Sequence, residues 1–334
     1  MRELRNSYLS IFGWGVFLAG ALSLGSCSSD ETIDAIQGEA ITFGDAFVEN
    51  STRATDPSYG ADKALEQFNV WGTVTGNTDN TINVFNGASV TRGDKAYGEA
   101  WTCNQTQYWI PDATYKFMAI AHGTVASSDA NKMPLTISYT ADGETDLLLG
   151  ELTSNGIKTV TTDGAAVPEI GVTEGKVVNF TMSHLLSKAV FTFTNTDASA
   201  TLTVSDIKMA GLNQKGTYTI SGENKGWTSN TPYGETPLAF GGDVTIGTGE
   251  SNTGTSQYER LIIPGTYDIT ITFTVSDNKG GKPQNMKATI ENHTFAIGNS
   301  YNFTADIKSG LKYIVFTITS SDWGKESGDR PIEG

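Results

Sequence analysis

The chain has 334 residues, only 18% of them charged, and its 37 acidic against 22 basic residues give a formal net charge of −15. Nucleic acids and anionic membrane surfaces are bound through basic patches, so this balance argues against both as partners. The aromatic, Thr, Ser, Asn and Gly content favours strands and turns over helices.

The first 31 residues follow the pattern of an exported lipoprotein. Arg2 and Arg5 precede an apolar run at 8–24, and Cys27 comes directly after a Leu-Gly-Ser step. A charged start, an apolar run and small residues before the cleavage point are typical of a secretory signal. A cysteine at that point resembles a bacterial lipobox, in which the cysteine receives lipid and becomes the new N-terminus. We predict a signal peptide over 1–26 and lipidation of Cys27, with an ordinary signal peptide as the alternative.

Cysteine usage limits the chemistry of the mature chain. Cys27 and Cys103 are the only two cysteines, so lipidation of the first leaves a single thiol. No intrachain disulfide then forms, and a zinc site built on several thiolates is excluded. We therefore expect β-sheet packing alone to hold the fold together.

A short strand is predicted at 40–48, close to the N-terminus of the mature chain. Ile41, Phe43 and Phe47 share one face of its period-2 pattern. A polar, turn-rich stretch follows, and Arg53 lies alone within it.

Strand patterns then follow one another to the end of the chain. Runs such as 68–74, 115–120 and 267–275 are rich in β-branched and aromatic residues and are separated by Gly, Pro, Asn and Asp. Such runs are typical of β-sandwiches, and we find no run of helical period. The mature chain is long for one hydrophobic core, so we predict two all-β sandwiches in tandem. The predicted divisions are 1–26, 27–53 with one strand, sandwiches at 54–180 and 181–310, and 311–334 as a C-terminal strand with a polar tail.

The last predicted strand, at 311–320, is apolar on both faces. Ile314, Phe316 and Ile318 lie on one face, and Tyr313 and Val315 lie on the other. A long apolar strand at a chain end pairs readily with another strand. This strand is therefore either built into its own domain or intended for another molecule.

Motifs of catalysis and metal binding are missing from the sequence. His122, His184 and His293 each lie among strand residues, so each fits a surface or half-buried strand position better than a catalytic base. The acidic stretch 142–146 lacks the spacing of a calcium loop and is interpreted as a turn. No nucleophile elbow, zinc-protease motif or phosphate-binding loop occurs. We predict no enzyme activity, no metal and no cofactor.

An aromatic group allows a second interpretation of the function. Tyr97, Trp101, Tyr108 and Trp109 are either a sugar-binding platform or part of a core, and their position beside strands favours the core. The platform would make the protein a monomeric surface lipoprotein that binds glycans, which we keep as the alternative function.

The sequence resembles the fimbrillin family, the type V pilins of anaerobic Gram-negative bacteria. The resemblance depends on the order of several motifs rather than on any one of them. These are the lipobox at Cys27, the step 52–54, the aromatic strand 115–119, the segments 182–191, 261–267 and 300–303, and the closing strand that ends at Trp323. It implies two transthyretin-like β-sandwiches in each subunit.

The resemblance also implies how a subunit is activated. The precursor would reach the outer membrane with lipid, such as palmitate, on Cys27, and an Arg-specific protease would cut between Arg53 and Ala54. The cut would release 27–53 and with it the strand that carries Ile41, Phe43 and Phe47. The C-terminal strand of another subunit would fill the groove, with Ile314, Phe316 and Ile318 in place of these residues.

The partners implied in this way are copies of the chain itself or related pilins. Their head-to-tail contacts would build a cell-surface fimbria that supports adhesion. We therefore expect a structural pilin that polymerises by protease-activated donor-strand exchange.

Overall fold

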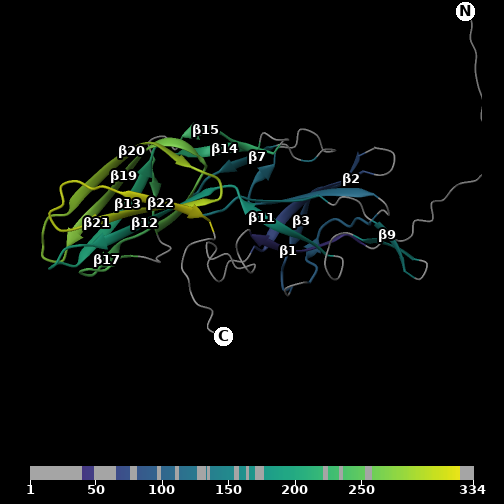
Figure 1. The fold of residues 1–334 in the computed structure, drawn as a ribbon, viewed down its shortest axis with the longest axis horizontal. Helices are drawn as coiled ribbons and strands as arrows, with labels where there is room; N and C mark the ends of the chain where they lie inside the picture. Colours follow the sequence, from purple (N-terminus) through teal and green to yellow (C-terminus); the bar gives the residue numbers. More distant parts are fainter. Residues whose placement is uncertain are drawn as a thin grey trace, which may run out of the picture. The chain divides into compact units, whose positions relative to one another are not determined.

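A computed structural model shows the fold. It describes residues 40–48, 65–75, 81–95, 99–109, 113–125, 133, 136–153, 158–162, 165–169, 177–220, 225–232, 236–252 and 258–323. Every element in these ranges is a β-strand (Figure 1), which confirms the all-β prediction. Among the same residues there is no helix long and apolar enough to cross a membrane. The strands belong to one compact unit, Gly38–Gly334.

A seven-stranded sheet contains most strands of the N-terminal half. β1 lies at its end and runs parallel to β11, whereas all other neighbours in the sheet are antiparallel. In sheet order the strands are β1 (Thr42–Val48), β11 (Val177–His184), β8 (Leu148–Thr153), β5 (Thr114–Ala121), β2 (Gln67–Thr75), β3 (Thr81–Thr91) and β4 (Thr102–Cys103).

The inner face of this sheet holds an aromatic core. Alternation of large apolar and smaller residues along each strand places one ring from each of several strands on the same side. The fully buried rings include Phe43 on β1, Phe68 on β2, Phe85 on β3, Phe117 on β5 and Phe180 on β11. β1 and β11, which are far apart in the sequence, therefore contribute to the same core.

Two further sheets face each other in the C-terminal half. One has the order β18 (Glu259–Ile262), β12 (Ser187–Asn195), β21 (Asn299–Ile307) and β22 (Thr317–Asp322). The other has the order β16 (Leu238–Ala239), β13 (Leu202–Ala210), β19 (Gly265–Asp277) and β20 (Gln284–Phe295), with β17 (Val244–Ile246) also paired to β13. Phe193 and Phe273, one from each sheet, have ring centroids 5.0 Å apart. Their shared apolar core makes this part a β-sandwich.

A fourth sheet joins strands from both sides of residue 180. Its order is β15 (Gly226–Pro232), β14 (Asn213–Thr219), β7 (Thr136–Thr140) and β6 (Thr124–Val125). Tyr139 and Tyr218 on its inner face belong to a third apolar cluster, which also contains Trp71 and Trp323. A separate hairpin is formed by β9 (Lys158–Thr162) and β10 (Ala165–Glu169). The division near residue 180 stays a prediction, because this sheet connects the two halves.

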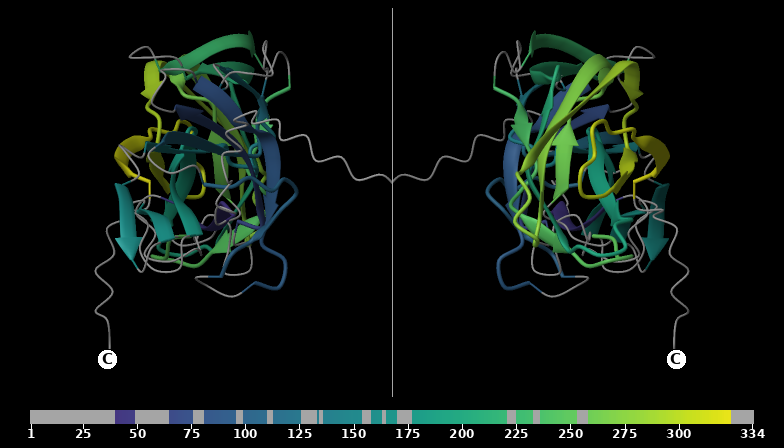
Figure 2. Two further views of the ribbon diagram at one scale, coloured as in Figure 1. Left: turned by 90° about the vertical axis from the view of Figure 1, so that its right-hand side faces the viewer. Right: turned by 90° about the vertical axis from the view of Figure 1, so that its left-hand side faces the viewer.

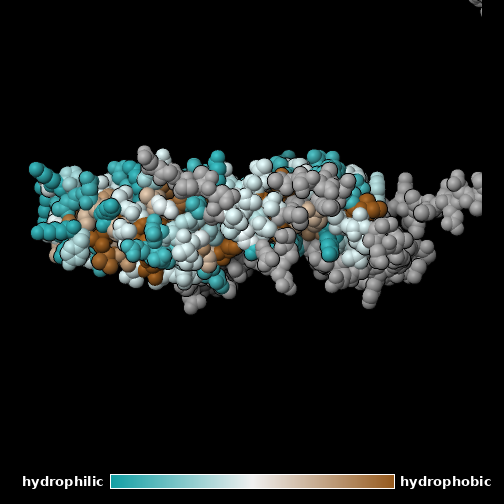
Figure 3. Space-filling model, turned by 90° about the horizontal axis from the view of Figure 1, so that it is seen from above, coloured by the Kyte–Doolittle hydropathy of each residue, from teal (hydrophilic) through white to brown (hydrophobic). Residues whose placement is uncertain are grey.

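The end of the described chain differs from the sequence prediction. The predicted strand 311–320 is replaced by a strand at 317–322, because the ladder between β21 and β22 ends where Thr304 pairs with Thr317. Tyr313 and Val315, 77% and 72% exposed, precede this strand. In both end-on views of Figure 2, β22 (yellow) lies at the outside. One face of the molecule shows apolar residues only as separate patches among polar ones (Figure 3).

Candidate functional site

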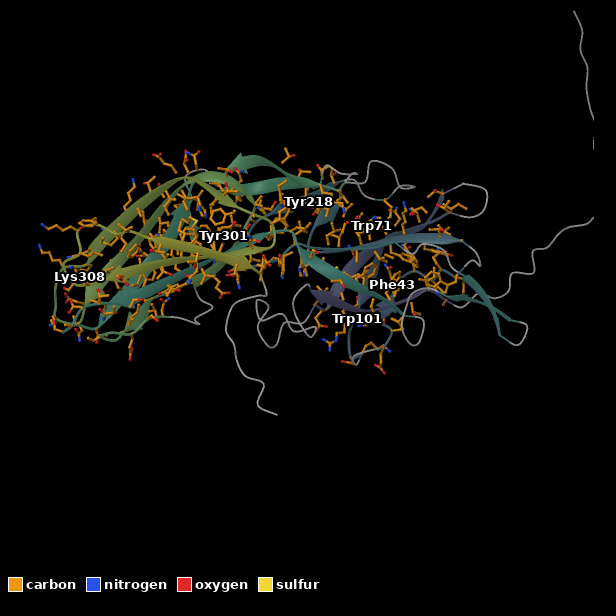
Figure 4. The ribbon with its side chains drawn as sticks, viewed as in Figure 1. Phe43, Trp71, Trp101, Tyr218, Tyr301 and Lys308 are labelled. Atoms are coloured by element: carbon orange, nitrogen blue, oxygen red, sulfur yellow. The ribbon has the colours of Figure 1, made fainter. Side chains whose placement is uncertain are left out.

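Phe43 places β1 at the centre of the N-terminal core. Its ring lies edge-on to Phe85 and Phe117, with centroids 5.1 and 5.7 Å away, and stacks on Phe180 at 6.1 Å. The Phe43 side chain lies among the strands of the N-terminal sheet (Figure 4) and is fully buried, and Ile41 is buried in the same apolar cluster. Two of the three residues predicted on the N-terminal strand are thus core residues of the seven-stranded sheet.

A bulge changes which residue of β1 follows Phe43 into the core. The register shifts between Phe43 and Ala46, so that Ala46 pairs with Phe180 and is buried. Phe47 pairs through its backbone with Thr181, and its side chain lies outside the described part of the chain. The period-2 pattern missed Ala46 because a bulge inserts one residue and reverses the alternation beyond it.

β1 is hydrogen-bonded along both of its edges. One edge forms the parallel ladder with β11. On the other edge, the Trp101 amide donates to the Phe43 carbonyl at 2.7 Å, and the Ile41 amide donates to the Gln107 carbonyl at 2.8 Å. Removing β1 therefore leaves backbone groups unpaired on both sides of a groove, which is unfavourable unless another strand replaces them.

Gly44 lets β1 approach β11 closely. A Cβ atom at this position would lie 2.4 Å from Cγ1 of Val177 and 2.8 Å from Oδ1 of Asn179. β1 and β11 can therefore pack this closely only with a glycine at position 44. A side chain there would push the two strands apart.

The predicted donor residues pack into their own sandwich. Ile314 is buried, and Phe316 and Ile318 are partly buried against the C-terminal core. The Phe316 ring lies edge-on to Phe191 at 5.7 Å and to Phe193 at 6.1 Å. In this state the C-terminal strand is built into its own domain, which is one of the two possibilities that its sequence left open.

The start of this C-terminal segment is fixed at Ser309. Its hydroxyl donates to Oδ2 of Asp277 at 2.6 Å, and its amide donates to Oδ2 of Asp197 at 3.0 Å. The Ser309 hydroxyl, followed by the amides of Gly281 and Lys279, lowers the pKa of Asp277. Both carboxylates are thereby favoured in the charged form that accepts these bonds.

The end of the segment is fixed by His184, one of the three histidines of the chain. His184 is buried, not surface-exposed or half-buried as predicted, and its Nδ1 donates to Oδ2 of the buried Asp146. The His184 ring stacks on Trp323, with centroids 3.7 Å apart. No local pattern links these three residues, so sequence reasoning missed the cluster.

The acidic stretch 142–146 forms a turn, as predicted. Oδ1 of Asp142 accepts from the amides of Glu144 and Thr145 at 2.8 and 2.7 Å. These bonds hold the Asp142 carboxylate against the backbone of the turn. In the part of the chain that the structure covers, no group of three or more His, Cys, Asp or Glu side chains has the arrangement of a metal site.

The aromatic residues near position 100 belong mainly to the core. Trp101 and Trp109 are buried in the N-terminal cluster, whereas Tyr108 is 56% exposed. The Trp109 ring lies edge-on to Tyr115 at 4.8 Å. Tyr97 lies outside the described residues. The core interpretation of the two tryptophans is confirmed.

Three predicted site residues, Cys27, Arg53 and Ala54, lie outside the ranges that the structure describes. Their roles in lipidation and cleavage stay predictions.

The fold is shared with a solved bacterial structure. A fimbrial protein from Bacteroides vulgatus is 15% identical, and the match covers 84% of this chain and 99% of that one with a TM-score of 0.58. A protein proposed to act in cell adhesion, from Bacteroides uniformis, is 17% identical, with 85% and 99% covered and a TM-score of 0.47. At such identities the first likeness establishes the fold alone.

The family itself is established by sequence. No curated protein matches the chain. A family model described as fimbrillin-like matches residues 52–323, which is most of the sequence. The matched range begins just before Arg53 and includes both β11 and β22. The chain belongs to the fimbrillin-like family.

Proposed function

We propose that this protein is a fimbrial subunit that polymerises by exchanging a strand after proteolytic loss of its N-terminal segment. The observation that carries the proposal is the position of β1. This strand precedes Arg53 in the sequence, yet its Phe43 lies in the middle of the N-terminal core. A cut between Arg53 and Ala54 would leave β1 attached by non-covalent contacts only.

Departure of β1 would open a groove beside β11. The groove would lose the buried side chains of Ile41, Phe43 and Ala46 and would expose the backbone edges that pair with β1. Such an edge is a template for another strand. The groove would therefore make the cut subunit an acceptor.

The C-terminal segment has the properties of a donor. Ile314, Phe316 and Ile318 alternate on one face, and β22 pairs only with β21 among the described strands. Each such side chain contributes about 1.5–3 kcal/mol when fully buried, so three of them offset much of the loss of contacts in their own sandwich. Donor and acceptor lie on different parts of the chain, so repeated exchange builds an open head-to-tail filament.

The N-terminal pattern supplies the route to the cell surface. A signal peptide over 1–26 and lipid on Cys27 would hold the precursor in the outer membrane until an Arg-specific protease cuts after Arg53. The subunit would then enter a fimbria of identical or related pilins and contribute to adhesion. Fimbrillin-like proteins are structural proteins and not enzymes, which agrees with the prediction made from the sequence.

The experiment uses the full chain with Cys27→Ser, treated with an Arg-specific protease and run unheated on a denaturing gel. We expect a new N-terminus at Ala54 together with a ladder of detergent-resistant multimers. Arg53→Ala should abolish both, and Arg92→Ala serves as the matched control that should leave both unchanged. A ladder of normal length from the Arg53→Ala variant would contradict activation by cleavage.

The alternative of a monomeric glycan-binding lipoprotein has less support. Its platform depended on Trp101 and Trp109, and both side chains are buried. Of the four aromatic residues considered for it, Tyr108 is the exposed one in the described part of the chain.

A further inference from the structure

Trp323 is buried directly after the C-terminal end of β22. Its indole packs face to face on the imidazole of His184, with ring centroids 3.7 Å apart and planes 6° apart. Nζ of Lys188 lies 5.6 Å from the centroid of the same indole. Trp323 is only 2% exposed and shares an apolar cluster with Leu185 and Leu186. A flat aromatic surface and a cation thus contact one indole ring.

The polar side chains around Trp323 are themselves held in place. His184 donates from Nδ1 to Oδ2 of Asp146, and both side chains are buried. Nζ of Lys188 lies 3.9 Å from Oε2 of Glu259. Buried charged groups keep their partners because an unpaired one would lack both water and a counter-charge. The imidazole plane is therefore a fixed surface for the indole.

The rest of the C-terminal segment is less buried than Trp323. From 311 to 323, only Ile314 and Trp323 are buried, and β22 forms a ladder along one edge with β21. An edge strand opens from its end, one ladder bond after another. Trp323 directly follows β22, and its amide donates to the Gly298 carbonyl at 2.7 Å. Its contacts must break before the strand peels from that end.

We propose that His184, Asp146 and Lys188 form a clasp that holds the C-terminal strand by Trp323, and that opening of the clasp sets how readily this strand leaves its own sandwich. This inference rests on the proposed function, because a donor strand must leave its own domain before it enters another subunit. It keeps an uncut subunit closed at one end of the donor segment.

Amide hydrogen exchange on the uncut full chain with Cys27→Ser tests the clasp directly. Trp323→Leu keeps an apolar side chain but loses the stacked ring, so the β22 amides should exchange roughly tenfold faster. Trp323→Phe keeps a flat ring and should produce a smaller increase. Tyr313→Leu, which changes an exposed aromatic residue of the same segment, is the matched control and should change nothing.

Two results would overturn the clasp. Equal exchange of β22 in the Leu and Phe variants would show that apolar burial, and not the stack on His184, holds the strand. Equally accelerated exchange in β22 and in the central strand β19 would show that Trp323 supports the whole fold. A milder variant, Lys188→Met, keeps the aliphatic stem and should accelerate β22 alone; unchanged exchange would remove Lys188 from the clasp.

Polymerisation of the same variants is measured separately. After cutting with the Arg-specific protease, Trp323→Leu should form its ladder of multimers sooner than the parent chain. Faster β22 exchange without any ladder would support the clasp and contradict the proposed function. A normal ladder with unchanged β22 exchange would support the proposed function and overturn the clasp.

Discussion

The amide of Trp101 donates a hydrogen bond to the carbonyl of Phe43 at 2.7 Å, on the edge of β1 opposite its ladder with β11. β1 is thus bonded on both sides. In the uncut chain it is a full member of the N-terminal core, even though it precedes the predicted cleavage position.

Phe43→Ala tests how much β1 contributes to this core. The ring fills the space between Phe85, Phe117 and Phe180, so its loss should lower the free energy of unfolding by about 3–5 kcal/mol. Urea unfolding of the uncut chain measures the change. Ile82→Ala, at an exposed position, is the control and should have little effect. A loss of less than about 1 kcal/mol would mean that β1 is not part of the core.

Gly44→Ala tests the close approach of β1 to β11. The added Cβ would overlap Val177 and Asn179, so the two strands should separate locally and stability should fall by about 1–3 kcal/mol. Amides of β1 should lose protection in hydrogen exchange. Gly242→Ala is the matched control, because no atom lies within 4 Å of a Cβ at that position. Equal protection of β1 in both variants would contradict the close packing.

A peptide of residues 311–323 tests the donor role without the rest of the chain. It should bind the subunit cut at Arg53 and block the ladder, because Ile314, Phe316 and Ile318 would fill the groove left by β1. Fluorescence anisotropy of the labelled peptide measures binding. The same peptide with Phe316→Asp should not bind, because a buried unpaired carboxylate is strongly unfavourable. Equal binding to the uncut chain would argue against a groove created by cleavage.

Acid should release the Ser309 end of the C-terminal segment. Hydrogen bonds hold the pKa of both carboxyls below the ordinary value of 3.8. The largest contribution for Asp277 comes from Ser309, and for Asp197 it comes from Ser199, followed by Ser309. The stabilisation is therefore complete above the unfolded value and is lost as the pH falls through the lower folded values. The Ser309 amide chemical shift should titrate below pH 3.8.

The control for this pH effect is Asp277→Asn, which removes one titrating group while keeping an oxygen that accepts a hydrogen bond. The acid transition at Ser309 should then reflect Asp197 alone and become smaller. A transition of unchanged size in this variant would mean that Asp277 does not anchor the segment.

Local patterns were sufficient to predict individual strands. The alternating run at 267–275 lies within β19, and the aromatic run at 115–120 lies within β5. Side-chain alternation has a period of two in any strand, so it is visible without knowledge of the neighbours. The same reasoning placed Ile41 and Phe43 correctly in the core, and it missed Ala46 because a bulge depends on the pairing partner.

The cluster around Trp323 lay beyond the reach of such patterns. Asp146 and His184 are 38 positions apart, and Trp323 comes from the last described strand region. Each residue alone resembles an ordinary member of a turn or strand. Only their contacts in the folded chain give them a common role.

By itself, the sequence determined that this protein is built from strands, that it carries the pattern of an exported lipoprotein, and that its family is fimbrillin-like. These properties depend on residue type and near-neighbour spacing. The tertiary structure decided that β1 pairs with β11. It also decided that the C-terminal strand is anchored in its own sandwich at Ser309 and against His184 of β11 at Trp323. Strand pairing joins residues far apart in the chain, and its energy comes from burial and hydrogen bonds that exist only after those residues meet.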